Sequence, residues 1–459
     1  MQENNEMASR GSRLGSKIVT VAIAILVLLI LVQLWKTLTN LLGIQSAPAA
    51  LFGQFTTLVL TAVLIWRVVL AVKHRPIPPC GDDRLPFITV IVPAYNEGAQ
   101  VRATLLSLAR SDYPHHRMRI IAVNDGSTDS TLEELRRAAC ELSGRVQVVH
   151  YSRNRGKRYA LHRGIALSRG EVIVTVDSDS EVRSDTLRHL VSPFVRDHRV
   201  GAVAGNVRVL NRQAGVIPRM LDVVFAWGFD FIRAGQSEVN TVMCTPGALS
   251  AYRRRVVLAV LDDWLHQTFC GRPANIGEDR AMTNLILRAG YHVLFQRDAV
   301  VYTEVPTRFP KLCRMLLRWA RSNIRETLIM SRFAFRRFRS TGSTGARINL
   351  ILSWVGLVSP LWWSLTVILL PLHPSLSALN LVLGASTGAL LPMTFYLVRR
   401  RCLGCLWALP YGLYSLLLLS WITPYALLTP HRTGWLTRGS GEAHVPTAVP
   451  LLPLRTDRP

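Results

Sequence analysis

The hydrophobic pattern divides the chain into three regions. Two long apolar runs come first, residues 18–35 without any charge and residues 51–72 interrupted only by Arg67. From residue 86 short apolar runs alternate with helical stretches, and three more long apolar runs follow residue 347. Runs of about 20 apolar residues are long enough to cross a bilayer as helices. The pattern therefore predicts a membrane hairpin, a folded central domain and a helical membrane region.

The central region alternates between two kinds of element. Apolar, mostly β-branched runs predict strands over residues 87–92, 119–123, 146–150 and 172–176. The stretches between them predict helices over residues 100–111, 130–142 and 157–168. Because repeated strand and helix units form parallel sheets with right-handed crossovers, we expect an α/β domain.

Acidic side chains follow the predicted strands at the points where the strands end. Asp177 and Asp179 come directly after the fourth strand, Asp125 follows the second and Glu97 the first. Side chains alternate along a strand, so Asp177 and Asp179 are expected to point the same way. Two such carboxylates suit a hard divalent cation that also binds substrate phosphates. For the acidic pair taken alone, a solvated turn is the alternative; together the acids predict a metal and nucleotide site at the carboxyl edge of the sheet.

Charged helical stretches separate this domain from the last apolar runs. Residues 217–234 are apolar but contain four charges, which predicts a helix at the membrane surface or against it. Residues 277–290 predict an amphipathic helix that begins with acids and stops at Gly290. A basic stripe at three- and four-residue spacing then predicts an interfacial helix, through Lys311, Arg314, Arg318, Arg321, Arg325 and Arg332.

The last three apolar runs span residues 348–372, 376–398 and 403–428. Basic residues lie before the first apolar run of the chain, after the second, and between the last two. They place the neighbouring ends of these runs in the cytoplasm. Pro410 and Pro424 would also allow the final run to break and re-enter. We therefore divide the chain into an N-terminal transmembrane hairpin (1–79), a cytosolic α/β domain (80–306), amphipathic interfacial helices (307–346), C-terminal transmembrane helices (347–428) and a tail (429–459).

Composition agrees with a membrane protein. The hydrophobic fraction is 49%, and the formal charge of +25 comes almost wholly from arginine, spread along the chain. Anionic lipid and a phosphorylated substrate explain this charge better than nucleic acid, which is not an expected partner. The seven cysteines are an odd number without framework spacing, which indicates reduced thiols.

Six short motifs occur in an order that identifies a family. They are Val92-Pro-Ala-Tyr-Asn-Glu97, Asp125-Gly-Ser-Thr-Asp129, Asn154-x-Gly-Lys157, Asp177-Ser-Asp179, Gly277-Glu-Asp-Arg280 and Arg318-Trp319. The set resembles the processive family-2 glycosyltransferases, and within them the hyaluronan synthases and the chitin-oligosaccharide synthases of nodulation. The resemblance covers residues 86–340 and implies a Rossmann-like GT-A fold for the cytosolic domain, beside an α-helical transmembrane domain.

The resemblance also implies roles for individual residues on the donor side. The residues implied to bind the nucleotide sugar are Tyr95, Glu97, Asp125, Lys157, Asp177 and Arg318, and the residue implied to bind the metal is Asp179. Departure of a nucleoside diphosphate develops negative charge, so a divalent ion, Mg²⁺ or Mn²⁺, and a cationic side chain suit the reaction.

On the acceptor side, the resemblance makes Asp279 the catalytic base, although an acid at this position would also cap a helix. Cys244, Glu278 and Trp319 would bind the acceptor, since an indole offers a flat apolar face to a sugar ring. Met315 and Leu316 replace two glutamines that are usual in the family. Trp435 and Arg438 resemble the ends of a gating loop, with Leu436 in place of glycine, and this requires a cytosolic tail.

The activity implied is that of an inverting hexosyltransferase in the plasma membrane, with several crossings and a cytoplasmic catalytic domain. Its partners would be UDP-sugar donors, UDP-GlcNAc first and UDP-GlcA second, together with membrane lipid and the growing polysaccharide that it translocates. Hyaluronan-type and chitin-type products are both consistent with the sequence. The alternatives are a nonprocessive lipid-linked transferase and, from a different class, a transporter with a degenerate nucleotide-binding domain.

Overall fold

The computed structural model describes residues 62–368, 371–372 and 374–432. The predicted span over residues 18–35 and the candidate gating residues Trp435 and Arg438 lie outside the described residues. Most of the predicted span over residues 51–72 does so too, and its described part, from residue 62, is helical.

A mixed sheet forms the centre of the described chain, in the strand order β3-β2-β1-β4-β7-β6-β10-β5. The four predicted strands are confirmed as β1 (Ile88–Ala94), β2 (Met118–Asn124), β3 (Val146–His150) and β4 (Val172–Thr175), all parallel. The other half adds β5 (Ser180–Val182), β6 (Val200–Val209), β7 (Ser250–Arg253) and β10 (His292–Thr303), with β7 antiparallel to both of its neighbours. The sheet is therefore parallel on the side where the sequence predicted a metal and nucleotide site.

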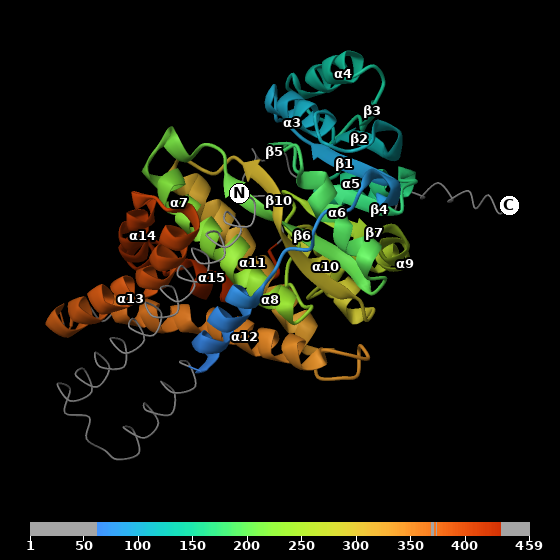
Figure 1. The fold of residues 1–459 in the computed structure, drawn as a ribbon. Helices are drawn as coiled ribbons and strands as arrows, with labels where there is room; N and C mark the ends of the chain where they lie inside the picture. Colours follow the sequence, from blue (N-terminus) through green and yellow to red (C-terminus); the bar gives the residue numbers. More distant parts are fainter. Residues whose placement is uncertain (1–61, 369–370, 373, 433–459) are drawn as a thin grey trace, which may run out of the picture.

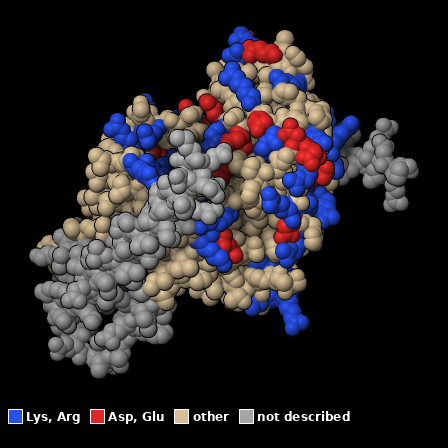
Figure 2. Space-filling view, viewed as in Figure 1, with Lys and Arg blue, Asp and Glu red and all other residues tan. Residues whose placement is uncertain are grey.

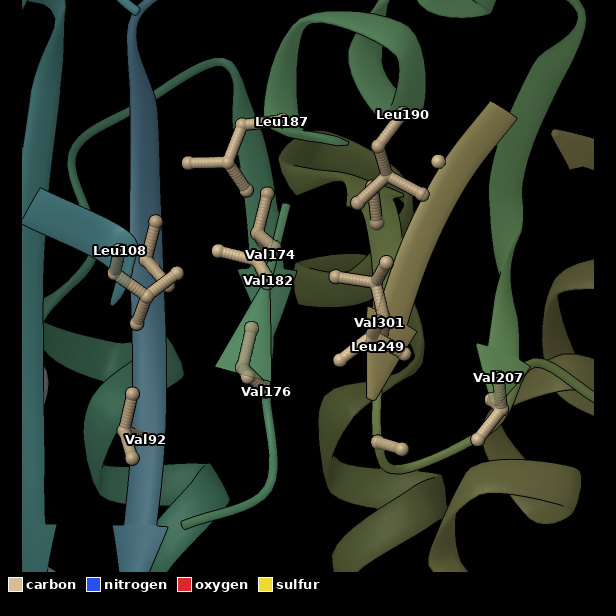
Figure 3. Close-up of a cluster of buried hydrophobic side chains, with 14 of the residues drawn as sticks. Val92, Leu108, Val174, Val176, Val182, Leu187, Leu190, Val207, Leu249 and Val301 are labelled. Carbon is tan, nitrogen blue, oxygen red and sulfur yellow. The ribbon is translucent and has the colours of Figure 1, made fainter. Parts of the chain in front are cut away.

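Helices cover both faces of this sheet (Figure 1). The predicted helices are confirmed as α3 (Gln100–Ala109), α4 (Thr131–Glu141), α5 (Lys157–Leu167) and α10 (Glu278–Arg288), and α6 (Thr186–Arg196) and α9 (Arg254–Leu265) are further helices. Residues of one strand alternate between two buried clusters: Val90 and Val92 of β1 face α3 and α6, whereas Ile91 faces α5. Figure 3 shows Val92, Leu108 and Leu187 in the first cluster. Burial on both faces explains why these strands are continuous apolar runs.

The charged stretch over residues 217–234 is part of a longer helix that packs inside the protein. It consists of α7 (Val216–Phe225), the π-helical turn η4 (Ala226–Phe231) and α8 (Ile232–Glu238), and it contacts β6, β10 and α13 (Pro374–Arg400). Asp230 is buried and paired with Arg297 and Arg399, at 2.7 and 3.4 Å. Partners distant in sequence therefore neutralise Asp230, and the expected position of this helix at or against a membrane surface stays a prediction.

The basic stripe lies on α11 (Phe309–Ser331), and only part of it is exposed. Arg321 and Arg325 are buried, with Arg325 fully enclosed and paired with Glu326 at 3.1 Å. The expected row of arginine heads in the lipid phosphate layer is thus wrong for these two positions.

The C-terminal region is helical, in α12 (Ser343–Ile368), α13, η5 (Leu403–Trp407), α14 (Ala408–Tyr414), η6 (Ser415–Leu419) and α15 (Ile422–Leu428). In Figure 1 these helices lie at the opposite end of the molecule from α4. By length and composition, no single helix in the described part of the chain qualifies as a membrane span, but Leu403–Leu419 and Ile422–Leu428 do so as a pair bent by 41°. The three predicted C-terminal crossings remain predictions.

Candidate active site

A lysine with only 16% of its side chain exposed joins the two halves of the candidate site. Lys157 is the first residue of α5, and its Nζ lies 2.6 Å from Asp177 Oδ1 and 2.9 Å from Glu278 Oε1. Burial alone would lower the pKa of Lys157, but the two carboxylates reverse this and raise it. Burial would likewise raise the pKa of Glu278, yet Lys157 and Arg318 lower it to about 2. Lys157 and Glu278 therefore both carry charge at neutral pH, and each stabilises the charged form of the other.

The two acids after β4 lie in a turn. The strand ends at Thr175, and the amide of Ser180 donates a hydrogen bond to the carbonyl of Asp177. The expected cause of their proximity, alternation along a strand, is therefore wrong, although Asp177 and Asp179 do lie close enough to interact. Burial and the charge of Asp177 raise the pKa of Asp179 to about 6.

A divalent cation would suit this pair of acids. Asp179 Oδ1 accepts hydrogen bonds from Ser180 and Thr303, at 3.1 and 3.3 Å. Across the described ranges, no group of three or more His, Cys, Asp or Glu side chains is arranged to hold a metal ion. The protein would supply one or two carboxylates, and the remaining ligands would be water and substrate phosphates, as is usual for Mg²⁺.

The loops after β1 and β2 bring the predicted nucleotide residues to the same edge. Asp125 is buried and accepts hydrogen bonds from the backbone amides of Arg155 and Gly156, at 2.9 and 2.8 Å. Burial raises the pKa of Asp125 to about 6 against the effect of these amides. Glu97 accepts a hydrogen bond from Ser178, within the acidic turn, at 3.0 Å, and Tyr95 follows β1 directly. The predicted donor residues are therefore neighbours in space.

Asp279 faces this cluster from the start of α10. Its Oδ1 accepts a hydrogen bond from the amide of Arg280 at 2.7 Å, and Cys244 Sγ lies 3.6 Å from its Oδ2. A helix N-terminus stabilises a carboxylate, but burial and the charge of Glu278 outweigh this and raise the pKa of Asp279. One pocket is lined by Lys157, Asp177, Glu278 and Asp279 together. A carboxylate with raised pKa in a pocket is suited to accept a proton.

The helix α11 carries the two remaining predicted site residues, Arg318 and Trp319. The charge of Arg318 lowers the pKa of both Glu278 and Asp279, which places its guanidinium near them. The ring of Trp319 lies 6.1 Å from Phe225 and 6.3 Å from Phe229, centroid to centroid. Glu278, which was expected at the acceptor, directs its carboxylate to Lys157, and its contact with the acceptor stays a prediction.

One residue of the site was not predicted from the sequence. Arg233 is buried in α8, and its charge interacts with Cys244 and Asp279. It lies between Ile232 and Ala234, and nothing in its spacing along the sequence indicates that it faces Asp279.

Comparisons with known proteins agree with this geometry. The model of the "Glycosyltransferase like family 2" matches residues 86–322. An N-acetylglucosaminyltransferase of Rhizobium meliloti (strain 1021) is 32% identical over 403 residues, which cover 83% of this chain and 89% of that protein. One of Rhizobium leguminosarum bv. viciae is 30% identical over 417 residues, covering 88% of this chain and 93% of that protein.

Among solved structures, the mannosyltransferase PcManGT from Pyrobaculum calidifontis, in complex with GDP-Man and Mn²⁺, has a similar fold. The TM-score is 0.55 at 20% identity, over 90% of this chain and 98% of that one. At this identity the similarity concerns the fold alone.

Replacing Gly277 tests how tightly the start of α10 is held. Gly277 has φ +70°, and a Cβ there would collide with the side chain of Ser322 on α11. Gly277→Ala should therefore lower the free energy of unfolding by about 1–2 kcal/mol for the left-handed backbone and by about 1–3 kcal/mol more for the collision. Gly271→Ala is the matched control, because its φ is +73° and the space around it is open. Equal losses in the two variants, measured by denaturant unfolding, would show that α10 and α11 are not in tight contact.

Proposed function

The chain belongs to the family-2 glycosyltransferases and is similar to their chitin-oligosaccharide synthases, and we propose that it polymerises N-acetylglucosamine from UDP-GlcNAc and passes the product across a membrane. The observation that carries the proposal is the contact of Lys157 with both Asp177 and Glu278. This contact joins the acidic turn expected to bind the donor diphosphate to the helix that begins with the expected base.

The donor would bind at the carboxyl edge of the parallel strands. Asp125 would meet the nucleoside, with Tyr95 and Glu97 beside it, and Asp179 would hold a divalent ion together with the diphosphate. Bound there, Mg²⁺ or Mn²⁺ would neutralise charge on the departing UDP. The guanidinium of Arg318 would also stabilise the negative charge of the departing UDP.

Transfer would proceed with Asp279 as the base. The acceptor hydroxyl attacks the anomeric carbon as the bond to UDP breaks, and its proton passes to the Asp279 carboxylate. Trp319 would stack on the acceptor sugar, beside Phe225 and Phe229. Displacement from the face opposite the leaving group inverts the anomeric centre, so an α-linked donor yields a β-linked chain.

A membrane location for the C-terminal region is part of the proposal. Many side chains that project outward from α12 and from residues 403–428 are apolar, including Ile351, Val355, Leu413 and Leu417. In Figure 2 the visible surface of α14 is mostly uncharged, whereas charges of both signs cover the α/β domain. Large apolar surfaces are uncommon on proteins surrounded by water. We therefore propose a multi-pass protein of the plasma membrane with its catalytic domain in the cytoplasm.

Product analysis tests the proposed reaction. The purified protein should form a polymer from labelled UDP-GlcNAc alone, should stop when EDTA removes divalent ions, and should resume with added Mn²⁺ or Mg²⁺. Asp279→Asn should form no polymer yet still bind UDP, because it lacks only the base.

Three results of that assay would contradict the proposal. A requirement for UDP-GlcA as well would indicate a hyaluronan-type copolymer, and a single sugar on lipid would indicate a nonprocessive transferase. Absence of UDP release from any sugar donor would favour the transporter alternative.

The pH dependence of transfer tests the electrostatics of Asp279. The base must be ionised, so the rate falls as the pH drops through its pKa, which burial and the charge of Glu278 raise. Glu278→Gln removes the second cause, so the acid limb of the rate profile should move to lower pH. Glu133→Gln, at an exposed position on α4, should leave the limb unchanged. An acid limb that stays in place or moves to higher pH in Glu278→Gln would show that Asp279 is not the titrating group.

A further inference from the structure

Arg233 is a buried cation at the border between the base and the aromatic rings. It lies in α8 just after the π-helical turn, and only 8% of its surface is exposed. Its guanidinium carbon lies 4.2 Å from the centroid of the Phe229 ring, and Phe229 in turn neighbours Trp319. On the other side it faces Cys244, which itself contacts Asp279. Arg233 therefore lies between the proposed stacking residue and the proposed base.

The hydrogen bonding of Arg233 is incomplete. Its Nη1 is buried and has no hydrogen-bond partner in the described part of the chain, and no carboxylate forms an ion pair with it there. Arg297, a comparable buried arginine nearby, is paired with Asp230 at 2.7 Å. A buried donor without a partner is costly and uncommon in proteins, so one left in a site is explained if a ligand supplies the acceptor.

The surroundings limit what that ligand can be. Asp279 is a carboxylate whose charge acts on Arg233, and the thiol of Cys244 interacts with both groups. A second anion would have to be buried beside Asp279, which costs far more than a neutral oxygen. A donor N–H beside an aromatic ring matches an acetamido group, which combines a carbonyl oxygen with an apolar methyl.

We propose that Arg233 recognises the acceptor, donating a hydrogen bond from Nη1 to the acetamido carbonyl of the sugar at the growing end. This rests on the proposed function, because it takes a chain ending in N-acetylglucosamine as the acceptor. The hydroxyl that loses its proton must lie at Asp279, and the ring must reach Trp319, so the sugar passes Arg233. The residue thereby selects the acceptor, whereas Lys157 and Arg318 serve the donor.

The test compares transfer with donor hydrolysis in the same preparation. The full-length protein is given UDP-GlcNAc with short N-acetylglucosamine oligosaccharides, and in a parallel arm with the deacetylated oligosaccharides. In Arg233→Gln the ratio of transfer to hydrolysis should fall by about tenfold or more with the acetylated acceptor, because one hydrogen bond from a charged group is lost. The preference of the unmodified protein for the acetylated acceptor should fall with it.

Arg339→Gln is the matched control, since Arg339 is also partly buried but binds the backbone around Asn240, away from the site. It should leave the ratio unchanged. Equal loss of transfer and hydrolysis in Arg233→Gln would overturn the proposal, because it indicates that Arg233 supports the site as a whole and not the acceptor. The ratio of transfer to hydrolysis could also fall while the preference for acetylated over deacetylated oligosaccharides stays the same. That result would overturn the proposal that Nη1 binds the acetamido carbonyl.

If Arg233→Gln does not bind UDP, Arg233→Lys replaces it in the same assay. Lysine keeps the charge but moves the donor, so the ratio should again fall, and an unchanged ratio would overturn the proposal. An unmodified protein that forms no N-acetylglucosamine polymer contradicts the proposed function itself. An active protein whose ratio is unaffected by both variants contradicts only the role of Arg233.

Discussion

The candidate site depends on one largely enclosed amine held between two acids. Lys157 begins α5, Asp177 follows β4, and Glu278 begins α10, so a single contact joins segments that are far apart in sequence. Glu278 is the buried member of this group, so loss of Lys157 leaves an uncompensated buried charge, which costs up to about 3–5 kcal/mol. The interaction therefore fixes the donor side of the site relative to the base, and it can do so only when the parallel strands and α10 are both in place.

The helix α11 holds the base from the other side. Arg280, beside the base, donates hydrogen bonds to Asn323 and Thr327, while Glu326 accepts hydrogen bonds from Gln267 and Asn284. Because these contacts lie in the second half of α11, the same helix that carries Arg318 and Trp319 also holds the start of α10, where Asp279 lies. The residues proposed to serve the leaving group, the acceptor and the base are thus held by one helix, which is a condition for keeping reacting atoms in a productive arrangement.

Much of the α/β domain could be predicted from the sequence, because its strands and helices have strong and regular patterns. The acidic pair was found for a wrong reason, since β4 stops at Thr175 and a turn brings Asp177 and Asp179 together. Arg325 was placed at a surface and the partners of Asp230 were not foreseen, because spacing along a helix does not reveal which other elements pack against it. The role proposed for Arg233 could not be foreseen, since it depends on which donor remains without a partner after folding.

The most direct test of whether the Lys157 amine organises the site is the affinity for UDP in the presence of Mn²⁺. It is measured by calorimetry in Lys157→Met and in the control Lys311→Met. Lys311 is exposed on α11, and its loss should leave the affinity unchanged. Loss of Lys157 leaves Asp177 and Glu278 repelling each other and the diphosphate, so the affinity should fall by about tenfold or more. If Lys157→Met binds UDP as tightly as the unmodified protein, the Lys157 amine does not organise the site and the account is contradicted.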